Sequence, residues 1–511
     1  MTATRWTVRL VSAAAYLSAI ACLAAALSYI GAFLWVALCR LGYPYELEWM
    51  EGGVLIHVQR VLAGQPLYVA PALDFVPFLY TPLYYYLAAP LTWLHEGFLP
   101  LRALSLLCAA PTLAVLYLWI QGRTQSRLAA SLGAGFYGAA FSATGFWYDL
   151  ARVDSLFILA LLSALWSLDG PAKNPRLLAS ALLFAVAFQC KQSSLMVIAC
   201  MAPMYLGGGR KRLAFSALAL AAGIPGMIWI LDRAHHGWYA YYVFGLPSHH
   251  AILKSAWLGF WTRDTLTVFP LAFLAGAVAL AGRFRQGDAR GTLFLVTGTT
   301  GMLSASYVSR LHVGGWDNVL MPAFAWLSLL TGLGIGTLER SWNAECEAEA
   351  RTFRRTSLSA LAVYAACLLQ FIRFAYDPRK QIPDGSDLVA GGRTEDWIRR
   401  TPGEVFIPDH GYLAQRAGKP PFAHRIAIED VLRGPEHPAR KALEVELASA
   451  LESGRFSALL MDSEQPSDAG ILPDTPKPRY RRTKTLPYGP REFMPRTGIK
   501  SRPEFVFEPW F

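Results

Sequence analysis

Long runs of apolar residues, broken only by short polar segments, fill the first three-quarters of the 511-residue chain. An α-helix needs about 20 mostly apolar residues to cross a bilayer, so these runs predict membrane-spanning helices. The first run, about 8–39, is too long for a signal peptide and lacks a small-residue cleavage site. It predicts an uncleaved span with Arg5 and Arg9 in the cytoplasm. The other clear runs are 101–121, 128–146, 155–169, 212–231, 266–282, 291–308, 317–337 and 355–376.

Two further segments are ambiguous. Residues 80–94 are short and rich in Tyr and Pro, which favours an interfacial or re-entrant element. Residues 177–206 exceed one span and are interrupted at Gln189-Cys190-Lys191-Gln192, which favours a hairpin of two short helices. These choices predict about eleven spans, a cytoplasmic amino terminus and basic cytoplasmic loops. The opposite choice for both segments also gives eleven spans, but it moves the basic residues within 123–176 outside.

The remaining residues, 378–511, have a different composition. They hold 21 Lys or Arg and 19 Asp or Glu, whereas the whole chain is only 16% charged. GEVFIPDHGYLAQRAGKP predicts a buried strand that leads to a loop and a helix, and FSALLMD predicts a second buried strand. Between them, 437–454 predicts a further helix. We therefore expect a transmembrane domain over 1–377 and a small soluble α/β domain over 378–511, on the external side of the membrane.

Charge and cysteine content exclude some functions. Most of the net charge of +11 lies in the membrane part, where it indicates topology. No basic stripe is interleaved with aromatic residues, so we expect no nucleic-acid partner. None of the seven cysteines lies in 378–511, and no pair has zinc-finger or redox spacing, which favours a role as small apolar packing residues.

The predicted topology brings several polar clusters to the external face of the membrane. Ionisable groups near a membrane are costly, so their convergence predicts a site. The clusters are 46–74, 149–154, 191–192, 310–318 and the His-rich segment 232–264.

Acidic residues occur in two of these clusters. In the first external loop (43–79), Glu48 and Glu51 share a face if the segment is helical, and such a pair can accept a proton or bind a hard cation. The alternative is an acidic helix start that only solvates the loop. Asp149 and Asp154 flank another predicted helix start, whose dipole alone would favour acids. A role in a site requires them to face Glu48.

Lys191 and Gln192 interrupt an apolar stretch, where an isolated ammonium group is costly. A broken helix pair would bring Lys191 to the water boundary beside free N–H groups, an arrangement suited to a phosphate. The alternative is an ion pair between Lys191 and a neighbouring acid, with Gln192 capping the break.

The segment SASYVSRLHVGGWDNVLMP joins two spans and contains Arg310, His312 and Asn318. An arginine here can bind a lipid phosphate bidentately, or it can anchor the chain at the interface. The histidines of 232–264 favour an interfacial aromatic segment over an acceptor-contacting loop. Asp409-His410 is a further pair that could contact an acceptor or serve only the local structure.

Four of these features occur together in a recognisable order. The first feature is the acidic pair of the first external loop with the pattern that continues from it, namely Glu51-Gly52, Arg60, Gly64 to Tyr68 and Tyr80 to Tyr86. Arg152-Val153-Asp154 comes next, Lys191 then interrupts a hydrophobic hairpin, and Arg310, Gly314-Gly315 and Asn318 precede another span. In this order and topology, over about 1–377, the chain resembles the GT-C superfamily of polytopic membrane glycosyltransferases. The similar members are the bacterial mannosyl- and aminoarabinosyl-transferase families.

The resemblance implies an inverting glycosyltransferase of the inner membrane. Such an enzyme takes a sugar from a polyprenyl-phosphate donor and transfers it to a glycan, lipid or protein acceptor on the external face. It implies a catalytic base at Glu48, with Glu51 as the competitor, and a donor-phosphate site formed by Lys191 and Arg310. The implied substrate-binding residues are Asp149, Asp154, Gln192, His312 and Asn318. Because the second acidic motif helps bind a divalent cation in some members, Asp149 and Asp154 are candidate ligands for Mg²⁺ or Mn²⁺.

Two other functions agree less well with the sequence. A transporter or flippase of a lipid-linked sugar should show inverted repeats with matching helix breaks, whereas the sequence has one clear break and no repeat. A non-catalytic membrane scaffold would leave Glu48, Glu51, Lys191 and Arg310 without a role.

Overall fold

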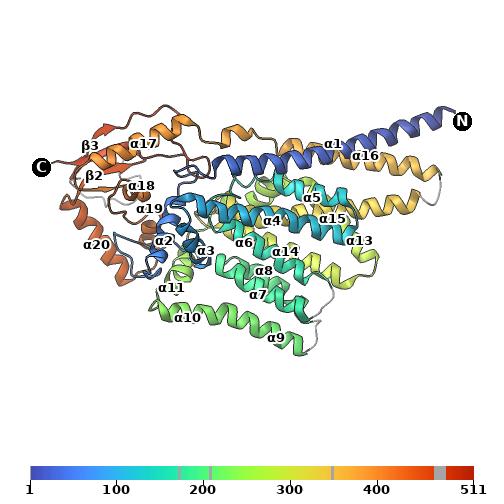
Figure 1. Ribbon diagram of the computed structural model, residues 1–511. Helices are drawn as coiled ribbons and strands as arrows, with labels where there is room; N and C mark the ends of the chain where they lie inside the picture. The colour runs from blue at the N-terminus through green and yellow to red at the C-terminus, as the bar shows by residue number, and fades with distance from the viewer. Residues whose placement is uncertain (1, 171–173, 207–209, 347–349, 465–478, 511) are drawn as a thin grey trace.

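The computed structural model describes residues 2–170, 174–206, 210–346, 350–464 and 479–510, and most of them are helical. Long helices run side by side, and the C-terminal residues gather at one end of this bundle (Figure 1). The chain is therefore a polytopic α-helical membrane protein, as predicted. The helices of the bundle are α1 (Thr2–Arg40), α4 (Phe98–Thr124), α5 (Arg127–Ala139), α6 (Asp154–Leu168), α7 (Asn174–Cys190), α8 (Ser194–Leu206), α9 (Arg210–Ala221), α10 (Met227–Ala234), α13 (Pro270–Arg285), α14 (Ala289–Leu311), α15 (Met321–Cys346) and α16 (Ala350–Arg373).

The predicted spans agree with these helices in position, with α9 and α10 sharing one span. A count of spans by helix length and apolar composition alone gives fewer than the eleven predicted. In the described part of the chain, five helices meet this criterion for crossing a membrane, and a bent pair, Lys254–Leu266 with Pro270–Arg285, would make six. Three further helices, including α6 and α8, are apolar but shorter.

The two ambiguous segments are both resolved. Residues 80–94 form a short helix α3 (Leu83–Ala88) and a 3₁₀ turn (Ala89–Trp93), too short to cross a membrane. The hairpin of α7 and α8 has the predicted break, because α7 ends at Cys190 and α8 begins at Ser194. Gln192 holds this break by donating from Nε2 to the carbonyl oxygens of Leu79, at 2.6 Å, and Val243, at 3.0 Å.

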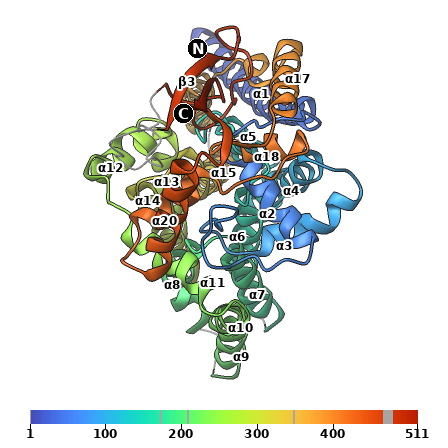
Figure 2. The ribbon, with the colours of Figure 1, turned by 90° about the vertical axis from the view of Figure 1, so that its left-hand side faces the viewer.

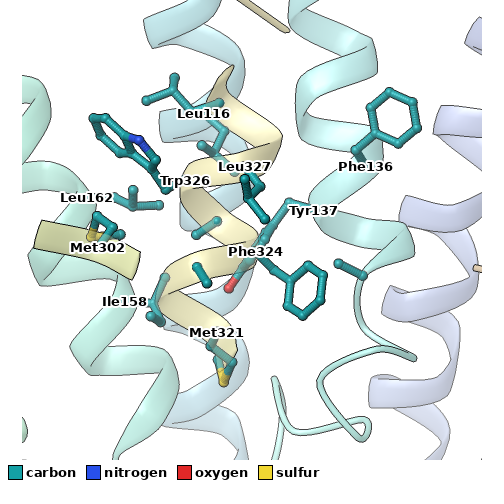
Figure 3. Close-up of a cluster of buried hydrophobic side chains, with 14 of the residues drawn as sticks. Leu116, Phe136, Tyr137, Ile158, Leu162, Met302, Met321, Phe324, Trp326 and Leu327 are labelled. Atoms are coloured by element: carbon teal, nitrogen blue, oxygen red, sulfur yellow. The ribbon is translucent and has the colours of Figure 1, made fainter. Parts of the chain in front are cut away.

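Helix α15 lies at the centre of the bundle, and its most apolar stretch is completely buried. Phe324, Trp326 and Leu327 of α15 are fully buried against side chains of α4, α5, α6 and α14 (Figure 3). Small residues farther along α15 let neighbouring helices come close. At Gly334, an added Cβ would lie only 2.2 Å from the backbone oxygen of Ala275 on α13.

The C-terminal residues form the predicted α/β unit. Its helices are α17 (Gly385–Arg400), α18 (Gly411–Arg416), α19 (Arg425–Arg433) and α20 (Pro438–Glu452), and its strands are β1 (Glu404–Phe406), β2 (Phe456–Met461), β3 (Tyr480–Thr485) and β4 (Phe505–Pro509). The strand order is β1-β2-β4-β3. The β1–β2 pair is parallel, and the other two pairs are antiparallel.

This unit shares its hydrophobic core with the first loop. Val54 and Val58 of α2 (Glu51–Leu62) are fully buried in the same cluster as Leu413 of α18 and Ile428 of α19. Helices α2 and α18 are neighbours in the end-on view (Figure 2). The position of the first loop therefore depends on the C-terminal residues as well as on the membrane helices.

The close approach at Gly334 generates the first prediction. Gly334→Ala should lower the free energy of unfolding in detergent by about 1–3 kcal/mol, because the new methyl group meets backbone rather than a movable side chain. Gly122→Ala on α4 is the matched control. It should be neutral or stabilising, because nothing lies within 4 Å of its Cβ and alanine favours helix. Equal melting temperatures for the two variants would contradict this packing.

Candidate functional site

A cavity of about 870 Å³ opens at the end of the bundle where the C-terminal unit sits. Its walls come from the first loop, the α7–α8 break, the end of α14, the segment 243–251 and helices α19 and α20. The apolar part of the lining includes Trp49, Phe78, Trp147, Phe244 and Trp316. The polar part consists of Glu48, Tyr80, Arg152, Lys191, Gln192, Ser193, Ser248, His249, His250, Ser309, His312, Asn318, Asp430, Arg433 and Arg440.

Glu48 is the first-loop acid that reaches this cavity. Its side chain is completely buried, and Oε2 accepts hydrogen bonds from Arg152 Nη1, at 2.7 Å, and from the Met50 backbone N–H, at 3.2 Å. Its other oxygen, Oε1, has no hydrogen-bond partner among the described residues. Burial raises the pKa of Glu48 to about 7, against the lowering effect of Arg152. Glu48 thus has a free carboxylate oxygen and a pKa suited to proton transfer near neutral pH.

Arg152 is a site residue to which the sequence analysis gave no role of its own. It is 2% exposed, and besides Glu48 it donates from Nη2 to the Tyr80 hydroxyl at 2.7 Å. Its Nε is buried and unpartnered within the described ranges. The sequence pointed to Arg152 only as a member of the motif Arg152-Val153-Asp154, which carried part of the family resemblance without a role for the arginine itself.

Lys191 lies in the α7–α8 break and lines the same cavity. Its ammonium group forms an ion pair with Asp154 Oδ1 at 2.7 Å, and Asn318 Nδ2 donates to the same oxygen at 3.1 Å. The predicted alternative, an ion pair with a neighbouring acid, is therefore present. Asp154 holds Lys191 in position, and the side chain of Lys191 remains 11% exposed toward the cavity.

The other site residues predicted from the sequence divide into those that line the cavity and those that do not. Gln192, His312 and Asn318 line the cavity together with Glu48 and Lys191. The structure does not place Glu51, Asp149, Asp154 or Arg310 in the lining.

Both carboxylate oxygens of Glu51 accept hydrogen bonds from neighbouring residues. Arg102 of α4 donates to Oε2 at 2.6 Å and to Oε1 at 3.1 Å, and the backbone N–H groups of Leu47 and Ala151 donate to the same carboxylate. Arg102 also donates to the carbonyl oxygens of Tyr43 and Tyr45. Glu51 thus has a structural role, because it joins the first loop to α4 and to the segment that carries Arg152.

Asp149 and Arg310 are likewise held in ion pairs within the protein. Arg40 at the end of α1 donates to Asp149 Oδ2 at 2.5 Å, and both side chains are buried. Arg310 pairs with Asp264 at 2.8 Å and with Asp317 at 3.3 Å, and it also donates to the carbonyl oxygen of Gly315 at 2.7 Å.

The two acids proposed as metal ligands do not fit a divalent cation in this arrangement. Asp149 is paired with Arg40, and Asp154 binds Lys191 and Asn318 through Oδ1, so the two acids leave Asp154 Oδ2 as a single buried oxygen without a partner in the described residues. Among the described residues there is no group of three or more His, Cys, Asp or Glu side chains that could hold a metal ion. We therefore derive no step through Mg²⁺ or Mn²⁺.

The Asp409-His410 pair lies outside the cavity lining and joins the C-terminal unit to the first loop. His410 is buried between two carboxylates, Glu46 of the first loop and Asp462 after β2. Burial alone would lower the pKa of His410, but the two carboxylates outweigh it and raise that pKa well above its usual value. Asp409 pairs with Arg425 at 2.7 Å. These contacts are structural.

The C-terminal unit also contributes side chains that sequence reasoning missed. Asp430 and Arg433 of α19 and Arg440 of α20 line the cavity on the side away from the membrane helices. Nothing in the local sequence of this unit distinguishes these residues from other charged positions on exposed helices. Only the tertiary position of α19 over the cavity identifies them.

Comparison with known proteins identifies the fold. No family model and no curated protein sequence matches the chain. Two solved structures of ArnT from Cupriavidus metallidurans do match in three dimensions. The one bound to undecaprenyl phosphate has 13% sequence identity and a TM-score of 0.57, and the match covers 94% of this chain and 97% of that one. The apo structure has 12% identity and a TM-score of 0.54, with 94% and 98% covered. The chain has a GT-C fold.

The match to the GT-C fold covers more of the chain than the sequence resemblance did. The resemblance was limited to about 1–377, whereas the structural match includes 94% of the chain and so extends into the C-terminal unit. In this GT-C fold, the cavity is enclosed by membrane helices and the C-terminal unit together.

The Glu51–Arg102 pair generates the prediction for this site. Arg102→Met should lower the stability of the protein by about 3–5 kcal/mol, because it leaves the Glu51 carboxylate buried without its counter-charge. Adding Glu51→Gln to Arg102→Met should restore part of this loss. Thermal unfolding of the purified single and double variants measures both effects, and an additive loss in the double variant would contradict the pairing.

Proposed function

We propose that this protein is an inverting glycosyltransferase that moves a sugar from a polyprenyl-phosphate carrier to an acceptor at the external face of the inner membrane. In this topology the amino terminus is cytoplasmic and residues 378–511 are external. The observation that carries the proposal is that Glu48, which has one carboxylate oxygen without a partner among the described residues, lines the same cavity as Lys191 at one end of a GT-C membrane bundle. The bound undecaprenyl phosphate of the similar ArnT structure supports the class of donor.

Lys191 would bind the donor phosphate. Its ammonium group lies in a helix break at the end of the membrane bundle, and Asp154 and Asn318 fix its position. Arg310 is a weaker candidate than the sequence suggested, since its donors already serve Asp264, Asp317 and Gly315. The mixed apolar and polar lining of the cavity suits the first part of a lipid chain together with its phosphate and sugar.

Glu48 would act as the general base. Its free oxygen takes the proton from an acceptor hydroxyl group, and the acceptor oxygen forms a bond to the anomeric carbon of the sugar. The bond from that carbon to the phosphate oxygen breaks at the same time, and its electron pair leaves with the polyprenyl phosphate. Attack from the face opposite the phosphate inverts the anomeric configuration. Because a phosphate leaves as an anion, positive charge at Lys191 suffices and no protein acid is required.

Arg152 would position the base. It holds Glu48 Oε2 at 2.7 Å and so directs the other oxygen away from itself. It also supplies a counter-charge that keeps the pKa of Glu48 from rising further. Tyr80, which accepts a hydrogen bond from Arg152, fixes the guanidinium from the other side.

The first test removes the base. Glu48→Gln should reduce transfer by about 10²–10⁴-fold, the usual contribution of a general base, because the amide keeps the shape of the side chain but cannot accept the proton. The assay is complementation of a deletion strain. Its missing glycan product is identified by mass spectrometry of envelope lipids and glycans, and the restored amount is then measured.

Two controls accompany this variant. Asp74→Asn changes an exposed acid of the same loop, which pairs with Arg455 at 3.5 Å, and should restore the product fully. The Glu48→Gln protein should still reach the membrane, but its melting temperature should fall because Arg152 is left buried without its carboxylate. The restored product is therefore compared per amount of folded protein in the membrane. Full complementation by Glu48→Gln would refute its role as the base.

The second test uses pH. A free glutamate has a pKa of about 4.3, whereas Glu48 has a pKa of about 7 because it is buried. Only the carboxylate form can take a proton, so activity is lost as pH falls through 7. The transfer rate in isolated membranes should fall about tenfold for each pH unit below 7 and level off above it. A rate that stays constant down to pH 5 would contradict this assignment.

A further inference from the structure

A second cavity, of about 210 Å³, lies at the opposite end of the bundle from the site described above. It is bounded by the last turns of α4, α6, α8 and α13 and the first turn of α14. The site described above lies at the other end of the same helices, since Asp154 begins α6 and Lys191 lies in the break before α8. None of the residues that line this cavity takes part in the proposed transfer reaction, so its chemistry has to be explained separately.

Three arginines and two aspartates line this second cavity, which we call the arginine pocket. They are Arg123 at the end of α4, Asp169 after α6, Arg283 in the last turn of α13, Asp288 before α14 and Arg290 in its first turn. The remaining lining is mostly small or apolar. The positive charges therefore outnumber the negative ones.

Both carboxylates already have partners. Asp169 pairs with Arg123 at 2.6 Å and accepts a hydrogen bond from the indole N–H of Trp119, also at 2.6 Å. Asp288 pairs with Arg283 at 2.5 Å and accepts from the Gly291 backbone N–H at 2.8 Å, so it caps α14. These contacts account for the charges of Arg123 and Arg283, and they leave the charge of Arg290 without a carboxylate in the described residues.

Arg290 is the unusual member of the pocket. Its Nε donates to the carbonyl oxygen of Gly170 at 3.0 Å, and its Nη1 donates to that of Met204 at 3.2 Å. Its Nη2 is shielded from solvent and finds no hydrogen-bond partner in the part of the chain that the structure describes. A shielded guanidinium N–H without an acceptor costs free energy, which an external acceptor would recover.

Two neighbouring features add to the positive potential. At Gly170, an added Cβ would lie 2.6 Å from an Arg176 nitrogen and 3.4 Å from an Arg123 nitrogen, so a fourth guanidinium adjoins the pocket. The 23-residue helix α14 also begins here, and its N-terminus carries partial positive charge. Guanidinium groups bind phosphate bidentately, and basic pockets between membrane helices bind anionic lipid headgroups.

We propose that the arginine pocket is a binding site for a phosphate group, supplied either by an anionic lipid headgroup or by a free phosphate ion. Arg290 binds it through Nη2, and Arg283 and Arg123 line the walls around it. Leu206 and Phe284, which follow Met204 and Arg283 closely in the chain, have exposed apolar side chains, as lipid-facing residues do. The site is independent of the transfer reaction.

The test measures binding to the full-length protein in detergent after lipid removal. One arm titrates inorganic phosphate, and the other adds phosphatidylglycerol in mixed micelles, with zwitterionic phosphatidylcholine as its reference. Melting temperature and native mass spectrometry report binding. We expect a saturable rise in melting temperature in at least one arm. A response to phosphatidylglycerol alone identifies the lipid headgroup, and a response to phosphate alone identifies the free ion.

Variants assign the response to the pocket. Arg290→Gln should weaken the apparent affinity at least tenfold, and Arg290→Lys should recover only part of it because lysine lacks the planar fork. Arg283→Gln should also weaken binding, and it provides a second reading if Arg290→Gln folds poorly. Arg285→Gln is the matched control, because Arg285 lies on the same helix end but is exposed outside the pocket. No response in either arm, or equal responses in Arg285→Gln and both pocket variants, would overturn the proposal.

Discussion

The geometry of the cavity depends on one buried ion pair, between Arg102 on α4 and Glu51 at the start of α2. Both side chains are completely buried, and between them they bind backbone groups of residues 40–47 and of Ala151. Glu48 and Arg152 each lie within a few residues of these anchors. A buried ion pair adds little net stability compared with apolar packing, but it permits few alternative arrangements. Its contribution here is to fix two loops relative to each other.

The remaining parts of the site are held by comparable means. The helix break at Lys191 is fixed by Gln192, and the ammonium group is directed by Asp154 and Asn318. The first loop is covered from the other side by the C-terminal unit, where Thr497 pairs with the Glu48 backbone and His410 bridges Glu46 and Asp462. The cavity is thus a joint product of the membrane bundle and the C-terminal unit.

Much of this arrangement could be predicted from the sequence. Hydropathy located the helices, and the polar interruption at 189–192 located the break, because both signals are local in the chain. The roles of the acids could not be assigned locally. Glu48 and Glu51 are only three residues apart, yet Glu51 pairs with Arg102 and Glu48 pairs with Arg152. Both arginines lie far from the two acids in the sequence. The ion pair of Arg310 with Asp264 and the position of Arg433 in the cavity lining likewise depend on the tertiary structure, so the local sequence does not indicate them.

The central claim of this account is that Lys191 binds the donor phosphate in the same cavity that the general base Glu48 lines. A cryo-electron microscopy structure of the protein with undecaprenyl phosphate tests it most directly. The account predicts density for the phosphate within about 3 Å of Lys191 Nζ, in the cavity that Glu48 lines. Phosphate density bound elsewhere, for example at Arg310 with the Lys191 cavity empty, would contradict it.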